Sequence, residues 1–161
     1  MSGLKFDKRE LGNLEYSLDR EVLSTDRRGG YMSTTIVGCN TRKYHGLMVA
    51  PIDQSDRTYV LLSSLDETVV QHDQSFNLAL HRFEGVYEPR GHKYITDFEY
   101  TPVPTITYRV GGVILKKELL WVHNRTQLMI RYTLVDAHSE TTLRLRPLLA
   151  FRDKHALSKA N

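Results

Sequence analysis

Apolar residues recur at every second position from residue 128 to 134, and this spacing constrains the fold more than any other feature of the chain. The recurring residues are Leu128, Ile130, Tyr132 and Leu134, with Met129, Arg131 and Thr133 between them. Side chains of a β-strand alternate between two faces, so a period of two predicts a strand with one buried face. Leu143 and Leu145 alternate with arginines after the polar turn "DAHSE". We expect the two runs to pair as a hairpin.

Paired glycines indicate a second turn between strands. Gly111 and Gly112 lie inside "TITYRVGGVILKKELLW", between two runs rich in β-branched and aromatic residues. Tight hairpin turns need positive φ values, which glycine adopts readily, so this segment predicts a β-hairpin. The segment "ETVVQHDQSFNLALHRF" predicts a further hairpin that turns near Asp73 and Gln74.

The rest of the chain also favours strands. Short β-branched or apolar runs are "YMSTTIVG", "HGLMVA" and "TYVLLSSL". The segment "GVYEPRGHKYITDFEYTPVPT" contains three prolines and predicts a long ordered loop, while helical spacing occurs near the N-terminus in "DKRELGNLEYSLDREV". Many short strands predict an all-β fold, an antiparallel β-sandwich with little helix. The polar ending "RDKHALSKAN" predicts an unfinished sheet, whose edge further chain, a partner or a second copy would cover.

Length and charge limit the possible functions. The 161 residues suit a single domain over 1–161, and 22 basic and 19 acidic residues are interleaved without a dense basic stripe, which argues against nucleic acid as a partner. Neither a secretory signal nor a membrane span is evident, so we expect a cytoplasmic protein. The single cysteine, Cys39, excludes an internal disulfide.

The stretch "NTRKYHGLMVA" concentrates hydrogen-bonding groups where a strand begins. His45 could act as a general base or donate to a glycan, or it could fix the start of the strand. Arg42 offers a fork of donors for a carboxylate or for sugar hydroxyls, and the alternative is a salt bridge to Asp26 or Asp66. In "STDRRGGYMSTT" no phosphate-loop pattern is present, so we expect a tight turn that presents Tyr31.

Two further segments combine aromatic rings with donors. The proline-containing segment holds Tyr87, Arg90, His92, Tyr94 and Tyr100, a set that suits either a carbohydrate surface or the anchoring of a loop. The segment "FRDKH" gathers Arg152, Asp153 and His155, which suit polar recognition or a domain interface. Trp121 ends an apolar strand and is expected in the core or at its rim.

Carboxylates and histidines give weaker signals. A glycosidase needs two carboxylates across the scissile bond, and the candidates are Asp66, Glu67, Asp97, Glu99 and Asp153. Adjacent acids are common in turns, so Asp66 and Glu67 predict a solvated turn. The histidines form no HxH or HExxH pattern, and we expect no metal site and no cofactor.

Several blocks, in order, resemble the N-terminal domain of bacterial and archaeal glycogen debranching enzymes of the amylo-α-1,6-glucosidase family. These blocks are "LSTDRRGGYMSTTIVGCNTRKYHGLMVA", "RTYVLLSSLDETV", "EPRGHKYITDF", "PTITYRVGGVILKKELLWVH" and "LRLRPLLAFRDKHAL". The resemblance implies a β-supersandwich of the galactose-mutarotase type that precedes a catalytic (α/α)6 barrel. The barrel, where the family's catalytic carboxylates lie, is absent from this chain, and the N-terminal domain is expected to be truncated.

The resemblance implies a non-catalytic domain that packs on the C-terminal barrel and contributes to binding of glycogen or maltooligosaccharide, with no catalytic residue of its own. The residues expected to bind glucan or face the barrel are Tyr31, Arg42, Tyr44, His45, Arg90, His92, Arg152, Asp153 and His155. Two alternatives stay open: a purely structural domain that stabilises the barrel, and an autonomous carbohydrate-active enzyme that uses Asp66 or Asp153.

Overall fold

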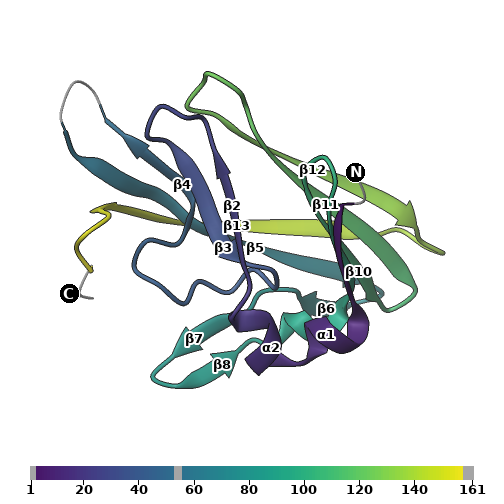
Figure 1. Ribbon diagram of the computed structural model, residues 1–161. Coiled ribbons are helices and arrows are strands. Elements are labelled where there is room, and N and C mark those ends of the chain that lie inside the picture. The colour runs from purple at the N-terminus through teal and green to yellow at the C-terminus, as the bar shows by residue number, and fades with distance from the viewer. Residues whose placement is uncertain (1–2, 53–55, 158–161) are drawn as a thin grey trace.

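The computed structural model describes residues 3–52 and 56–157, which form two antiparallel sheets packed face to face (Figure 1). The first sheet has the strand order β1-β9-β10-β11-β12. Its strands are β1 (Leu4–Asp7), β9 (Ile95–Tyr100), β10 (Pro104–Val110), β11 (Val113–Trp121) and β12 (Leu128–Asp136). The antiparallel β-sandwich predicted from the sequence is confirmed.

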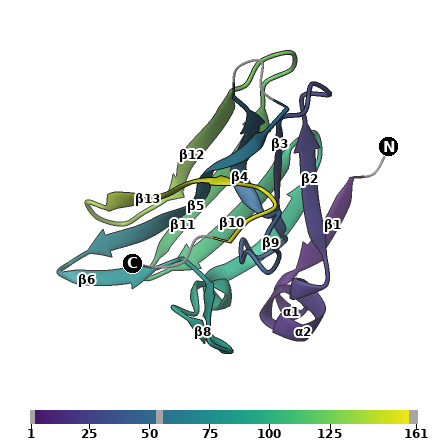
Figure 2. The same ribbon diagram turned by 90° about the vertical axis from the view of Figure 1, so that its left-hand side faces the viewer.

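The second sheet has the order β13-β5-β4-β3-β2, and β6 also pairs with β5. Its strands are β2 (Glu21–Thr25), β3 (Tyr31–Thr35), β4 (Gly46–Pro51), β5 (Thr58–Gln71), β6 (Gln74–Asn77) and β13 (Thr142–Asp153). A separate hairpin, β7 (His81–Phe83) with β8 (Val86–Glu88), lies at the same end of the sandwich as the helices (Figures 1 and 2).

Two predicted hairpins are confirmed. Strands β10 and β11 join through Gly111 and Gly112, whose φ values of 56° and 78° suit a primed two-residue turn. Strands β5 and β6 join through His72 and Asp73, and these residues also have positive φ values. In both cases the turn residues and the flanking strand patterns point to the same structure.

The hairpin predicted between residues 128–134 and 143–146 is wrong. Strand β12 pairs with β11 in the first sheet, whereas β13 pairs with β5 in the second, and Figure 2 shows β13 running along β5. The segment "DAHSE" therefore crosses from one sheet to the other. Leu128, Ile130 and Tyr132 of β12 and Leu143 of β13 are partly buried and pack against the core. A strand that packs one face in this way has the same period of two in a hairpin and in a crossover.

The long loop predicted over the proline-containing segment is also wrong. This segment contains β8, the 3-10 helix η1 (Gly91–Tyr94) and the whole of β9. Its prolines lie at element boundaries: Pro89 precedes η1, Pro102 lies in a turn, and Pro104 opens β10. Proline is tolerated at the first residue of a strand, so these prolines mark the ends of strands and do not exclude them.

The predicted helical segment forms two short helices, α1 (Lys8–Gly12) and α2 (Leu14–Leu18). Asp7 caps α1 by accepting from the N–H of Glu10, and the Glu10 side chain accepts from the N–H of Asp7. Asn13 caps α2 in the same way through Tyr16. Such caps satisfy backbone donors that have no partner inside the helix.

The core lies between the sheets and takes side chains from both. Phe98 and Trp121 come from the first sheet and Met32 and Val69 from the second, and each is at most 6% exposed. Trp121 is therefore a core residue, as predicted. No helix in the described part of the chain is long and apolar enough to cross a membrane.

A buried ion pair joins the two sheets inside this core. Lys117 of β11 contacts Oε1 of Glu67 in β5, and the Tyr132 hydroxyl of β12 donates to the same oxygen. Glu67 is 2% exposed and Lys117 6%. The prediction that Asp66 and Glu67 form a solvated turn is therefore wrong, because both lie inside β5. Adjacent acids resemble a turn in sequence, and the partners of Glu67 are 50 or more positions away.

The buried ion pair yields a stability prediction. Glu67→Gln should lower the free energy of unfolding by about 3–5 kcal/mol, because it leaves the Lys117 ammonium in the core without a counter-charge. The double variant Glu67→Gln/Lys117→Met should lose less than the sum of the single losses, as measured by urea unfolding in a double-mutant cycle.

Lys116→Met, on the opposite face of the same strand, is the matched control. Lys116 is far more exposed than Lys117, so the control should change stability by about 0.5 kcal/mol or less. An equal effect of Glu67→Gln and Lys116→Met would show that the ion pair does not hold the sheets together.

Candidate functional site

His45 anchors the loop that precedes β4. Its side chain is 2% exposed, and its Nδ1 accepts hydrogen bonds from the backbone N–H groups of Thr41 (2.9 Å) and Arg42 (3.3 Å). Its Nε2 lies 2.9 Å from Oε1 of Glu21 in β2. Because Nδ1 accepts, the neutral ring carries its proton on Nε2 and donates it to Glu21. Loop, ring and neighbouring strand are thus connected.

The protonation state of His45 follows from the same contacts. Burial lowers the pKa of His45; the hydrogen bond and charge of Glu21 oppose this effect, and the charge of Arg42 adds to it. A neutral ring keeps Nδ1 as an acceptor for the loop. In an imidazolium, Nδ1 would carry a proton that faces the backbone N–H groups of Thr41 and Arg42, and both hydrogen bonds would be lost. Both ring nitrogens are occupied, so of the two roles considered for His45 the geometry favours the anchor of the strand's start.

Arg42 makes an ion pair, but not with the acids expected from the sequence. Its Nε contacts Oε1 of Glu21, and its side chain is 69% exposed. The predicted partners were wrong because both are engaged elsewhere: Asp26 accepts from the N–H groups of Arg28 and Gly30, and Asp66 pairs with a histidine. The Asp26 contacts close the tight β2–β3 turn that precedes Tyr31, as predicted.

The segment after β13 folds against this loop. The Tyr31 hydroxyl donates to the backbone carbonyl of Tyr44 (2.9 Å), and the Tyr44 hydroxyl lies 3.4 Å from Nδ1 of His155. Arg152 donates from Nη2 to the Lys43 carbonyl (2.8 Å). Asp153 accepts from the backbone N–H of His155 (2.9 Å). We call this set of connected residues the loop corner: Tyr31, Arg42, Tyr44, His45, Arg152, Asp153 and His155. Seven of the predicted residues therefore lie together.

Arg90 and His92 do not join the loop corner through any hydrogen bond or ion pair among the described residues. They lie at η1, which packs against α1 and β10. His92 is 4% exposed, and burial, with the charges of Arg90 and Lys93, lowers its pKa. Its Nδ1 has no hydrogen-bond partner in the described structure. His92 therefore belongs to the packing at the helical end of the sandwich, and Arg90 is exposed beside it.

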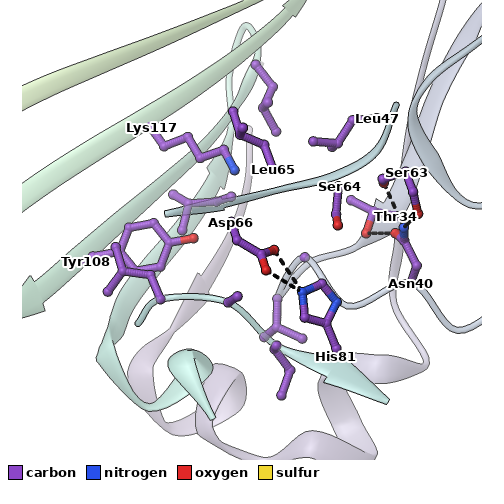
Figure 3. Close-up of a pocket in the computed structure, with 17 residues that line it drawn as sticks. Thr34, Asn40, Leu47, Ser63, Ser64, Leu65, Asp66, His81, Tyr108 and Lys117 are labelled. Carbon is purple, nitrogen blue, oxygen red and sulfur yellow. Dashed lines mark hydrogen bonds and ion pairs between the residues drawn. The ribbon is translucent and has the colours of Figure 1, made fainter. Parts of the chain in front are cut away.

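A histidine–aspartate pair that the sequence did not reveal lies beside the loop corner. Nε2 of His81 lies 2.8 and 2.9 Å from the two carboxylate oxygens of Asp66, and Figure 3 shows the two side chains facing each other. An ionised carboxylate only accepts, so Nε2 is the donor and Nδ1 is free to accept from or donate to a ligand. The two residues are 15 positions apart on β5 and β7, and no spacing motif connects them.

The pair separates an interior cavity from a hollow on the surface. The interior cavity, drawn in Figure 3, has a volume of about 40 Å³ and is lined also by Tyr108 and Lys117. A cavity needs roughly 10–15 Å³ for each water molecule, so this one holds a few waters at most. It is far too small for a sugar ring.

The surface hollow, which we call the outer depression, is larger. It has a volume of about 600 Å³ and lies over β5, β13 and the β7–β8 hairpin. Its polar side chains include Asp66, His81 and Arg146, and its apolar rim includes Phe83 (60% exposed) and Leu149 (77% exposed). Arg146 has no ion-pair partner among the described residues, although it lies opposite Asp66 in the strand register. Volumes of roughly 300–1,000 Å³ are typical of small-molecule sites.

The residues present limit the chemistry of this surface. Asp66 is the single carboxylate that the described residues contribute to the outer depression, and His81 already binds both its oxygens. Among the described residues no three His, Cys, Asp or Glu side chains lie together as ligands for a metal ion. The arrangement can bind polar and apolar groups side by side, which is the requirement of a binding site.

A family model for the N-terminal domain of glycogen debranching enzymes matches residues 20–161. The chain belongs to this family. Searches of curated proteins and of solved structures returned no match. In this member of the glycogen debranching enzyme N-terminal family, the matched residues cover β2 to β13 and therefore the loop corner and the outer depression, whereas β1, α1 and α2 precede them.

The contacts of His45 predict a pH dependence of stability. The pKa of His45 is lower in the folded chain than in the unfolded chain, where it is about 6.5, so the unfolded state binds more protons at acid pH. The contribution of His45 is complete above about pH 6.5 and should fall as the pH drops below that value. Urea unfolding between about pH 8 and pH 5 measures this loss.

The variant His45→Asn retains an acceptor near the Nδ1 position but cannot titrate, so it should show a weaker loss below about pH 6.5, with His92 supplying the remainder. His45→Ala should cost about 2 kcal/mol at neutral pH, because two buried N–H groups lose their acceptor. His138→Asn, at an exposed position, is the control. An unchanged pH profile in His45→Asn would contradict the assignment.

Proposed function

We propose that this chain is a non-catalytic N-terminal domain of a glycogen debranching enzyme, which packs on the catalytic barrel and contributes to α-glucan binding. Family membership supports the parent enzyme. The observation that carries the binding role is the outer depression, in which charged donors and acceptors lie next to exposed apolar side chains.

The lining of the outer depression suits a pyranose ring. Hydroxyl groups both donate and accept, and they would meet the Asp66–His81 pair and the guanidinium of Arg146, which has five donors. The C–H face of a sugar is apolar and would cover Phe83 and Leu149, which are otherwise in contact with water. A neutral polysaccharide such as glycogen needs this mixture of polar and apolar contacts.

The loop corner extends the same surface. Ser63, Arg152 and Leu157 line both the outer depression and a smaller hollow at the loop corner. Tyr44, 39% exposed, stands edge-on to His155 with a ring-centroid distance of 5.6 Å. A glucan chain that leaves the outer depression in this direction would meet these two rings, or the barrel would pack on them.

The alternative role, in which the domain only stabilises the barrel, has its own supporting observation. Leu149, Phe151 and Leu157 are each at least 69% exposed and come from the end of β13 and the segment after it. An apolar surface of this kind also suits a domain interface. The two roles differ in whether the isolated chain binds glucan.

Binding is tested by titrating the 161-residue chain with maltoheptaose and with a branched glucan in a calorimeter. His81→Ala should weaken binding about tenfold, since one charge-assisted contact and the orientation of Asp66 are lost. His138→Ala, which removes an exposed imidazole from outside the depression, should bind as the parent chain does. If the parent chain binds neither glucan, the structural role replaces the binding role.

The non-catalytic assignment predicts no turnover. The pure chain should release no glucose from glycogen or from an α-1,6-linked disaccharide, because the described residues place only one carboxylate at the outer depression and glycosidases use two, about 5–9.5 Å apart. Sensitive detection of reducing sugar checks this. Turnover that disappears in Asp66→Asn or Asp153→Asn would establish an autonomous enzyme instead.

A further inference from the structure

The smaller hollow at the loop corner is lined by four basic side chains and by no carboxylate among the described residues. Arg42 and Lys43 come from the loop before β4, Arg82 from β7, and Arg152 from the end of β13. The hollow, which we call the basic depression, has a volume of about 380 Å³. Three segments that are distant in sequence thus bring like charges to one place.

The charge of the basic depression is largely uncompensated. Glu21 neutralises Arg42 through Nε, and this is the one ion pair that any of the four basic residues makes with a described acid. Lys43 and Arg82 lie over the rings of Tyr44 and Tyr87, at 5.0 and 6.0 Å from the ring centroids. Aromatic faces attract cations weakly and leave the N–H donors available. Like charges this close repel one another until an anion binds.

Part of the donor set is held in place before any ligand arrives. Arg152 donates from Nη1 to the Ala156 carbonyl (2.7 Å) and from Nη2 to the Lys43 carbonyl (2.8 Å), which fixes the plane of its guanidinium. Arg42 is fixed through Nε by Glu21, which leaves its terminal amino groups free of ion pairs. Guanidinium groups oriented in advance lose less conformational entropy when they bind.

We propose that the basic depression binds an oxyanion, either inorganic phosphate or the phosphoryl group of a phosphorylated sugar. Guanidinium forks match the oxygen spacing of a phosphoryl group and bind it with two parallel hydrogen bonds, and an ammonium adds a point charge. The volume accommodates a sugar phosphate as well as the free ion. This site differs from the outer depression in ligand charge, and it does not depend on whether neutral glucan binds there.

The test uses the 161-residue chain at low ionic strength. Inorganic phosphate and glucose 1-phosphate are titrated by calorimetry and by thermal unfolding, with maltose as the neutral ligand and sodium chloride at equal ionic strength as the screening control. Both phosphates should raise the melting temperature, and chloride should not reproduce the shift.

The matched pair of variants is Arg82→Ala and Arg109→Ala. Both residues are exposed arginines on strands: Arg82 lies on β7 of the separate hairpin, and Arg109 lies on β10 of the first sheet. Loss of one charged contact should weaken phosphate binding about tenfold in Arg82→Ala and leave it unchanged in Arg109→Ala. Equal weakening in the two variants, or no phosphate effect beyond that of chloride, would overturn the proposal.

Comparing the affinities for inorganic phosphate and glucose 1-phosphate shows which of the two kinds of ligand the site binds. Tighter binding of glucose 1-phosphate than of inorganic phosphate assigns the site to a phosphorylated sugar, and equal or weaker binding assigns it to the free ion. Failure of maltooligosaccharide to bind removes the glucan role without affecting the phosphate result, so the two proposals fail separately.

Discussion

The ion pair between Lys117 and Glu67 is the contact on which the rest of the structure depends. It joins the two sheets across the apolar core, and the Tyr132 hydroxyl completes the coordination of the carboxylate. The buried Lys117 charge needs Glu67 beside it, and only one register of β5 provides this, because a shift by one residue would move Glu67 to the outer face. The same shift would move the neighbouring Asp66 into the core. One buried contact therefore sets which acid faces the outer depression.

Successive side chains of β5 face opposite sides of the sheet, so the two adjacent acids have different roles. Glu67 points inward and links the sheets, and Asp66 points outward and receives both hydrogen bonds from His81. The β7–β8 hairpin brings His81 to this position, because Leu78, shortly before the hairpin, donates its backbone N–H to the Glu67 carbonyl. Fold stability and the polar lining of the depression thus share one strand, and a change in the core at Glu67 should disturb the surface at Asp66.

Local patterns in the sequence were sufficient to predict strands and turns. They were insufficient to predict which strands pair and which side chains meet. The Gly111–Gly112 hairpin could be predicted because turn chemistry and strand pattern are both local. The pairing of β12 and β13 could not, since a half-buried strand has the same period whichever neighbour it takes. Among site residues, the block Arg42 to His45 was found from its polar density. The Asp66–His81 pair was missed, because its members look like a turn acid and an isolated imidazole until β5 and β7 are placed side by side.

The proposed binding role is supported by the contacts that the acids near the two depressions already make. A glycosidase needs one carboxyl that can give up a proton and a second that can attack or activate water. Here Glu21 is held by Arg42 and His45, Glu67 by Lys117 and Tyr132, and Asp66 by His81. A carboxylate whose oxygens are already bound by such partners holds those partners in place. Such acceptors orient arginine and imidazole donors, and oriented donors are what a hydroxyl-rich or anionic ligand requires.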